Sequence, residues 1–194
     1  MATKVVRTKK KGAVKVIHNM LVRVTIGAQM ASAAPPLGPQ LGQRGINIPA
    51  FCKHFNGETS HIQPGVPLPT RITVNANRSY DLEICSPLTS WLIKRAAGIR
   101  RASEGKGEIA GKLSVKHVYE IAKAKSKDKM LVGVPLKEIC EMVVKQCHSM
   151  GIEVVKQDLD PVEYKKFLED RKVVVDAQLK ALAEKKAAKA LRTT

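Results

Sequence analysis

The spacing of hydrophobic residues changes at Ser86-Pro87, and this change constrains the fold more than any other feature of the 194-residue chain. Before this point apolar and polar residues alternate, which is the period of a half-buried strand. After it, apolar residues recur every three or four positions, the period of an amphipathic helix. The sequence therefore predicts an α+β protein, with a small α/β domain over residues 20–85 and a helical domain over residues 86–157.

The first domain is expected to hold a three-stranded sheet and a helix. The alternating apolar positions of its strands are Met20, Val22, Val24 and Ile26, then Ile72 and Val74, and finally Tyr80, Leu82 and Ile84. The polar residues between the last two strands predict a hairpin turn. Asn47 is a suitable helix N-cap, and Pro49 suits the first turn of the helix. Asn56-Gly57 is a suitable end of the helix. These signals predict a helix with Phe51 and Phe55 on one face.

The second domain is expected to be a three-helix bundle followed by a short strand over residues 152–155. The predicted boundaries are a Ser86 cap and Gly98 for the first helix, a Ser114 cap for the second, and Pro135 and Gly151 for the third. The expected inward-facing residues are Leu88, Trp91 and Leu92, then Val115, Val118, Ile121 and Ala122, and finally Leu136, Ile139, Val143, Cys147 and Met150.

Two segments flank these domains. Residues 1–19 form an acid-free basic arm, and two interpretations stay open for it: an organelle-targeting sequence or a disordered arm on RNA. Residues 158–194 contain an amphipathic helix after Asp160-Pro161, expected to be a docking helix or appendage, with a membrane-surface helix as the alternative. Its apolar stripe is Tyr164, Phe167, Leu168, Val174, Val175, Leu179 and Leu182.

The net charge of +17 points to a polyanionic partner, with nucleic acid ahead of an anionic membrane. Segments 1–20, 21–85, 86–157 and 158–194 contribute +6, +2, +7 and +2. The helical domain is therefore expected to bind phosphates, and the nearly neutral first domain to do something else. The longest uncharged stretch, residues 24–43, is interrupted by prolines, so no membrane insertion is expected.

The helical domain offers several candidate phosphate contacts. Aromatic residues make up only 4% of the chain, too few for base-stacking platforms, so recognition of folded RNA by shape and phosphate is expected. The loop over residues 99–112 is expected to be mobile until phosphates order it, with a solvated linker as the alternative. Gly151 would allow close approach of RNA, or simply end a helix. The candidates are Lys94, Arg95, Arg100, Arg101, Lys106, Lys112, Lys116, Lys123, Lys125, Ser149, Met150 and Gly151.

The sequence shows no convincing catalytic set. The GxGxxA match over residues 105–110 lacks a preceding strand, and Gly111-Lys112 lacks the other residues of a P-loop. Cys52 and Cys147 each lie near a histidine in sequence, but neighbours on a helix do not share a face, so core cysteines are favoured over nucleophiles. Cysteine spacing signals neither disulfides nor zinc. No enzyme activity, metal, cofactor or small-molecule substrate is expected.

Several segments resemble one known family. PPLGPQLGQRGINIPAFCKHFN over residues 35–56 closely resembles the N-terminal signature of the universal large-subunit ribosomal protein L11 family. LIKRAAGI (92–99), AGKLS (110–114), HVYEIAKAK (117–125) and SMGIEVV (149–155) look like that family's RNA-binding domain, in the same order and spacing. The similarity covers about residues 20 to 157 and adds Gly98 and Ser114 to the candidate RNA contacts.

The resemblance implies a function that composition alone does not. It implies binding to the rRNA of the GTPase-associated centre at the stalk base, beside stalk ribosomal proteins, with a hinged N-terminal domain that elongation and initiation GTPases touch. It also implies that Pro35, Pro36 and Pro39 belong to a proline helix that faces a factor and antibiotic cleft between the N-terminal domain and RNA, with Gln43 in the same cleft. A non-ribosomal architectural RNA- or DNA-binding protein is the alternative.

Some residues depart from the bacterial pattern of this family. Ala33 stands where many bacterial members have proline, Ser86-Pro87 replaces a Pro-Pro pair, and the loop over residues 100–110 differs in composition. The basic arm and the helix beyond Asp160 exceed that pattern, while PLPTRI (67–72) and LSVKHVYEIA (113–122) look like the mitochondrial branch. The sequence therefore favours a mitochondrial ribosome over the cytoplasmic ribosome of a bacterium-like system.

Overall fold

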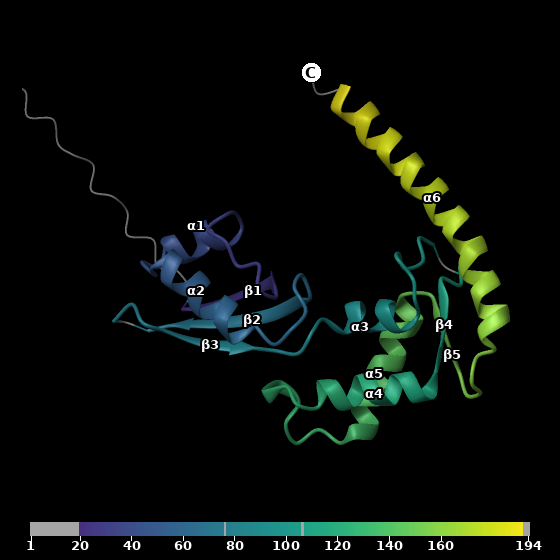
Figure 1. Cartoon of the computed structure of the whole chain (residues 1–194), viewed down its shortest axis with the longest axis horizontal. Coiled ribbons are helices and arrows are strands. Elements are labelled where there is room, and N and C mark those ends of the chain that lie inside the picture. The colour runs from purple at the N-terminus through teal and green to yellow at the C-terminus, as the bar shows by residue number, and fades with distance from the viewer. Residues whose placement is uncertain (1–19, 76, 106, 192–194) are drawn as a thin grey trace, which may run out of the picture.

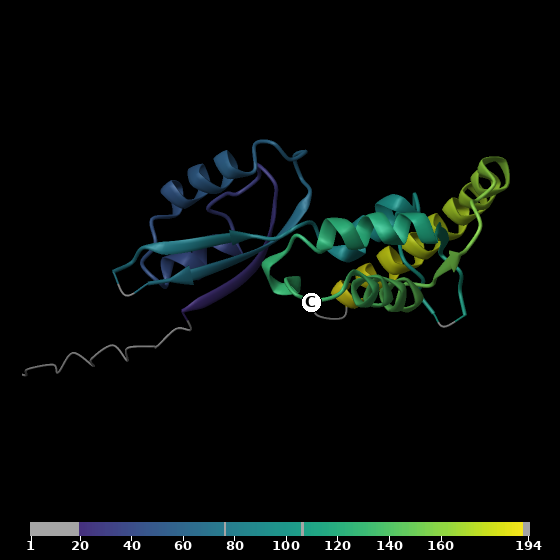
Figure 2. The same cartoon turned by 90° about the horizontal axis from the view of Figure 1, so that it is seen from below.

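The computed structural model describes residues 20–75, 77–105 and 107–191, so the predicted arm over residues 1–19 lies outside the described part of the chain. The chain forms two bodies that lie end to end, with a long helix on the second (Figures 1 and 2). The elements in order are β1 (Leu21–Gly27), α1 (Leu37–Gly42), α2 (Ile48–Glu58), β2 (Pro67–Val74), β3 (Tyr80–Ile84), α3 (Thr89–Ala96), β4 (Gly111–Ser114), α4 (Val115–Lys125), the 3₁₀ helix η1 (Lys129–Leu131), α5 (Leu136–Ser149), β5 (Ile152–Val155) and α6 (Pro161–Leu191).

The first body is an antiparallel sheet in the order β1-β2-β3, as the alternating pattern predicts. Val22 pairs with Ile72, and Ile72 pairs with Leu82. The helix α2 contributes Phe51 and Phe55, which are fully buried in the same hydrophobic cluster as Ile72. The predicted α/β domain is confirmed, and its core is the contact between α2 and the sheet.

The ends of α2 show how the local sequence determines the helix. The Asn47 side chain accepts a hydrogen bond from the Ala50 amide at 3.2 Å, as expected of an N-cap. The helix continues to Glu58, past the predicted end at Asn56-Gly57, because the next residue, the buried Thr59, closes it with a hydrogen bond from its hydroxyl to the Phe55 carbonyl. Glycine inside the last turn is tolerated here at a modest cost.

Periodicity did not reveal α1, a helix of six residues in the Pro/Gly-rich stretch, and only the family resemblance implied a helix at these prolines. Leu37 and Leu41 are buried on its inner side. Gly38 must be glycine, because a Cβ there would lie 2.1 Å from the Ala33 carbonyl oxygen. Short helices with proline and glycine carry weak periodicity, so close packing rather than pattern defines this one.

The second body contains the three predicted helices and the predicted strand β5, but also β4, which sequence reasoning placed in a loop. β4 and β5 form a parallel two-stranded sheet in which Gly111 pairs with Ile152 and Ser114 with Val155. Gly111 and Lys112 therefore belong to a strand, and the predicted loop ends at Ala110. With only four residues, β4 is too short to show alternation in the sequence.

Three finer predictions about the bundle were wrong. Leu88, not Ser86, occupies the N-cap position of α3. Val115 is 47% exposed because it follows the Ser114 cap directly, on the outer side of the first turn of α4. Trp91 packs against the core of the first body instead of the bundle, whose buried residues from α3 are Ile93 and Ala97. The helix α3 thus contacts both cores.

Ser86 has a different role at the junction between the bodies. Its amide and hydroxyl donate to the two Asp128 carboxylate oxygens at 2.7 and 2.8 Å. The Lys125 ammonium donates to the Ser86 carbonyl at 3.2 Å and to Asp128 at 3.3 Å. Because both charged side chains are almost fully buried, this cluster fixes the linker against the end of α4.

The last helix, α6, lies along the second body and continues beyond it (Figure 1). Val175 is buried, whereas the predicted stripe residue Val174 is 46% exposed. The buried Arg171 lies one turn before Val175, a position that the apolar stripe did not include. Within residues 20–75, 77–105 and 107–191, no helix is long and apolar enough to cross a membrane.

Candidate RNA interface

Two of the predicted RNA-binding segments meet in the structure. The loop after α3 runs beside the end of α5, where the Ser103 amide donates to the Met150 carbonyl at 3.0 Å and the Ala110 amide donates to the Gly151 carbonyl at 2.7 Å. Because β4 pairs with β5, Lys112 follows directly beside this corner. We call this surface, residues 98–105, 107–112 and 149–151, the basic edge.

Gly151 occupies the residue after the C-cap of α5 with a φ of +71°, so its role as a helix end is confirmed. A Cβ at this position would lie 2.5 Å from the Glu108 carbonyl oxygen and 2.6 Å from the Ser103 Cβ. The close approach that needs glycine is therefore an approach of the protein's own loop. Gly151 shapes the basic edge by letting the loop pack on the helix end.

The cations of the basic edge differ in their freedom. Arg100 is exposed, while Arg101 lies 3.6 Å from Glu104. The Lys112 ammonium is 3.5 Å from Glu153 and its side chain is 39% exposed. Such exposed pairs contribute little to stability and exchange readily for a phosphate partner. Arg100 and Lys112 therefore stay candidates for RNA contact, whereas the Arg101 side chain is only 26% exposed and also donates to Gln178.

Other predicted contacts lie elsewhere on the second body. Lys94 and Arg95 are in the last turn of α3 and lead into Gly98 and the basic edge. Lys116 lies beyond the opposite end of β4, where its ammonium bonds Asp158 at 2.7 Å and lowers the pKa of that carboxyl. Lys123 is exposed in the last turn of α4. All four residues stay predictions, and Lys116 and Lys123 are separated from the basic edge along α4.

Two predicted contacts do not suit RNA in this structure. Ser114 is buried and its hydroxyl oxygen accepts a hydrogen bond from the Lys116 amide at 3.4 Å, which caps α4. The Lys125 side chain is only 10% exposed and is bonded to Ser86 and Asp128. Asp128 lies only three residues away, but sequence periodicity could not reveal this burial, because lysine is rarely buried and the Ser86 segment that covers the pair is 39 residues distant.

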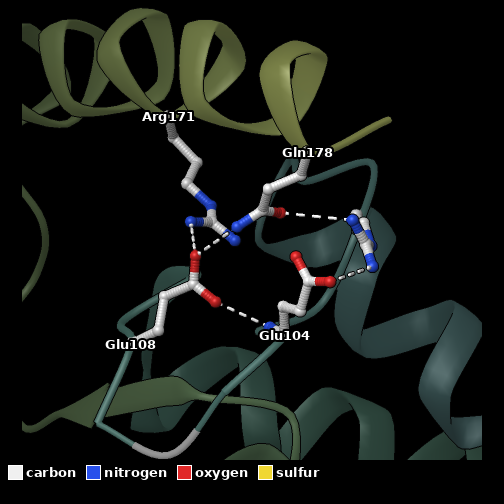
Figure 3. Close-up of polar contacts among 5 residues, drawn as sticks. Glu104, Glu108, Arg171 and Gln178 are labelled. Atoms are coloured by element: carbon white, nitrogen blue, oxygen red, sulfur yellow. Dashed lines mark hydrogen bonds and ion pairs between the residues drawn. The ribbon is translucent and has the colours of Figure 1, made fainter. Parts of the chain in front are cut away.

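Sequence reasoning missed four residues of α6 that face the loop. A groove between the two elements is lined by Arg100 and Arg101 on one side and by Lys165 and Lys172 on the other. Figure 3 shows that Arg171 and Gln178 reach Glu108 on the loop. The i, i+7 spacing of these two residues places them on one face of α6, which is the signal that would have paired them.

Glu108 is the acid at the centre of these contacts. One carboxylate oxygen accepts hydrogen bonds from Arg171 and from the Gln178 amide, the latter at 2.9 Å. The other oxygen accepts from the Glu104 amide at 2.6 Å. The hydrogen bonds from Arg171 and from the Glu104 backbone lower the pKa of Glu108 to about 2. Glu108 is therefore a carboxylate at neutral pH.

The predicted factor and antibiotic cleft lies on the first body. Pro35, Pro36, Pro39 and Gln43 are all exposed, on and around α1. The buried Leu37 and Leu41 hold the opposite side of the helix in the core. The structure thus presents an uncharged surface of prolines, well suited to a protein or an apolar ligand, whose partner stays a prediction.

The cysteines fit core positions. Burial raises the pKa of the Cys147 thiol to about 11, so it stays protonated at neutral pH and is a poor nucleophile. Burial also raises the pKa of Cys52. Among the described residues, no group of three or more histidine, cysteine or acidic side chains is arranged to hold a metal ion.

Comparison with known proteins identifies the family. The model for "Ribosomal protein L11, N-terminal domain" matches residues 22–80, and the model for "Ribosomal protein L11, RNA binding domain" matches residues 85–154. The chain is 65% identical to the large ribosomal subunit protein uL11m of Caenorhabditis elegans, over 97% of this chain and 96% of that protein. The chain belongs to the ribosomal protein L11 family. This membership confirms the predicted resemblance and the predicted non-enzymatic class.

Two further relatives match different shares of this chain. The large ribosomal subunit protein uL11m of Drosophila melanogaster is 48% identical over 95% of this chain and 94% of its own length. The large ribosomal subunit protein uL11 of Roseobacter denitrificans is 39% identical over 99% of its own length, but the match covers only 73% of this chain. More than a quarter of this L11 chain therefore lies outside its match to the bacterial relative.

Proposed function

We propose that this L11 protein anchors itself through the basic edge to the rRNA of the GTPase-associated centre, at the stalk base of the large ribosomal subunit. The observation that carries this proposal is the meeting of the Arg100–Lys112 segment with the Ser149–Gly151 corner. Two segments separated by about forty residues in sequence build one cationic, glycine-shaped surface. A rigid surface of this kind suits recognition of RNA by shape and phosphate.

The first body supplies the second half of the proposed function. Its net charge is close to zero, and its exposed prolines around α1 lie on a body with a core of its own. We infer that this uncharged surface meets elongation and initiation GTPases transiently, and stalk proteins nearby, while the basic edge holds RNA. The cluster of Ser86, Lys125 and Asp128 gives the linker between the two surfaces a fixed base.

We further propose that the ribosome in question is mitochondrial. The relatives that match this chain over nearly its whole length are the proteins named uL11m from the worm and the fly. The bacterial relative matches a shorter part of the chain. The high identity of the worm and fly matches thus favours the mitochondrial branch.

A binding titration of the full chain tests the proposal. The protein is titrated into the folded GTPase-centre fragment of the large-subunit rRNA and into a base-scrambled RNA of equal length, at several salt concentrations. A preference of about 10³ or more for the folded fragment at physiological salt is expected. Equal, steeply salt-dependent binding to both RNAs would favour an architectural nucleic-acid binder and overturn the proposal.

A further inference from the structure

We propose that α6 is a built-in positioning element for the RNA-binding loop: Arg171 and Gln178 hold Glu108, and through it the loop, in the conformation that presents Arg100 to RNA. This inference rests on the proposed rRNA function and extends it to a helix that lies beyond the residues matched by the RNA-binding family model. Arg171 and Gln178 are positioning residues here, because they act on RNA through the loop.

The contacts cross-link the loop at both of its acidic residues (Figure 3). Arg171 and Gln178 bind one oxygen of Glu108, whose other oxygen accepts from the Glu104 amide. Gln178 also accepts a hydrogen bond from the Arg101 guanidinium at 3.3 Å, and Arg101 pairs with Glu104. The ring of contacts closes on itself, so α6 fixes three loop side chains through two of its own.

The pairing of Arg171 with Glu108 changes the charge that the loop presents to RNA. Residues 99–110 carry three basic and two acidic side chains, so without further contacts the net charge of the loop is only +1. Arg171 neutralises Glu108 and draws it toward α6. An acid that is paired with the protein's own arginine no longer repels a phosphate that approaches Arg100. The helix thereby leaves the loop with a net positive surface.

The helix is anchored independently of this network. The Tyr164 hydroxyl donates to the Ala97 carbonyl at 2.6 Å and accepts from the Lys112 amide at 3.3 Å. Leu168 packs beside Gly98, and Val175 is buried. Because α6 would stay docked without Arg171, the loop contacts can be removed without releasing the helix.

Arg171 is also not the residue that stability alone would place here. It is only 8% exposed, and two of its guanidinium nitrogens, Nε and Nη2, are buried without a hydrogen-bond partner among the described residues. Buried unpaired donors are costly, and a hydrophobic residue often replaces a buried ion pair without loss of stability. The guanidinium fits a role in placing Glu108 better than a role in holding the fold.

The test compares full-length Arg171→Met with Lys166→Met, which removes one charge from an exposed position of the same helix. Two quantities are measured: amide hydrogen exchange of the free protein and the Kd for the folded rRNA fragment. Methionine at position 171 keeps the apolar stem of the side chain and removes the charged hydrogen bond from Arg171 to Glu108. The thermal midpoint of each variant shows that the fold is retained.

In Arg171→Met we expect the Glu104 amide, which donates to Glu108, to exchange at least about tenfold faster. The Kd for the rRNA fragment should weaken by about tenfold, the size of one lost charge-assisted hydrogen bond. Lys166→Met should change the Kd less than about twofold. Unchanged exchange at Glu104, or an equal loss of affinity in both variants, would overturn the inference.

Failure of the proposed function gives a different result. In that case the unmodified protein itself shows no preference for the folded rRNA over the scrambled control. The exchange measurement is made without RNA, so it still decides whether α6 holds the loop. Arg171→Lys, which keeps the charge, should restore part of the protection at Glu104.

Discussion

The two bodies of this L11 protein are of similar length but expose opposite kinds of surface. The first body buries two phenylalanines against a sheet and exposes an uncharged proline surface. The second must expose arginines and lysines close to acids, and every ion pair of Arg101, Lys112, Lys116, Lys125 and Arg171 lies there or on α6. A phosphate-binding surface therefore needs its acids held in fixed places, whereas a protein-facing surface needs only its shape.

The largest expected effect separates the two cores. Phe55→Ala should destabilise the first body by about 3–5 kcal/mol, because the ring is fully buried. The Kd for the rRNA fragment should change less than about threefold, since the basic edge belongs to the other core. Urea unfolding and RNA titration of the same variant measure both.

The control for this comparison is Ile139→Ala in the second body, where the side chain is buried on α5. It should destabilise the second body by about 2–5 kcal/mol and weaken RNA binding with it. Loss of RNA binding in Phe55→Ala at a temperature where Ile139→Ala retains it would show that the division between the bodies is wrong.

The junction between the bodies gives the next effect. Asp128→Ala should cost about 3 kcal/mol, because it leaves the buried Lys125 ammonium and the Ser86 amide without their main partner. Asp158→Ala serves as the control: it removes an exposed partner of Lys116 and should leave the urea midpoint unchanged. Equal behaviour of the two variants would mean that the junction cluster does not hold the linker.

Acid should affect the loop of the second body specifically. The pKa of Glu108 is lowered to about 2, so its contacts stabilise the fold fully above its ordinary value near 4.5 and are lost as the pH falls toward 2. The free energy of unfolding, measured from pH 5 to pH 2, should fall less steeply in Glu108→Gln than in the unmodified protein. Glu120→Gln, a change at an exposed glutamate of α4, should follow the unmodified protein. Parallel curves for all three proteins would contradict the assignment.

The smallest effect distinguishes two lysines that sequence reasoning treated alike. Lys112→Gln should reduce the salt slope of RNA binding by about 0.9 or less, the contribution of one phosphate contact. Lys116→Gln should leave that slope unchanged, because Lys116 lies beyond the end of β4 that is far from the basic edge. A reduced slope in Lys116→Gln with an unchanged slope in Lys112→Gln would mean that RNA binds at the other end of β4.

The sequence predicted the fold most reliably where a pattern repeats. Alternation identified β1 and β3, and three-to-four spacing identified α3, α4 and α5. It located the interior of β2 but not its beginning, since Pro67 and Pro69 obscure the pattern. Its main omissions, α1 and β4, are four to six residues long and owe their conformation to packing against distant segments.

The site was only partly predictable, for a physical reason. A lysine or arginine in the sequence carries the same charge whether it is free or paired. The burial of Lys125 depends on the Ser86 segment, and the pairing of Lys116 depends on Asp158; both partners lie about forty residues away and become neighbours only through folding. The same applies to Arg171 and Glu108, which lie 63 residues apart. Composition predicted how much charge the domain carries, and the fold decides which charges face outward.

The most direct test of this account is amide hydrogen exchange of the full chain, free and bound to the folded GTPase-centre rRNA fragment. The account predicts new protection over residues 98–105, 107–112 and 149–151, with unchanged exchange over residues 35–43 on the first body. Protection around Pro35–Gln43 without protection at the basic edge would contradict it, because RNA would then be held by the body assigned to protein partners.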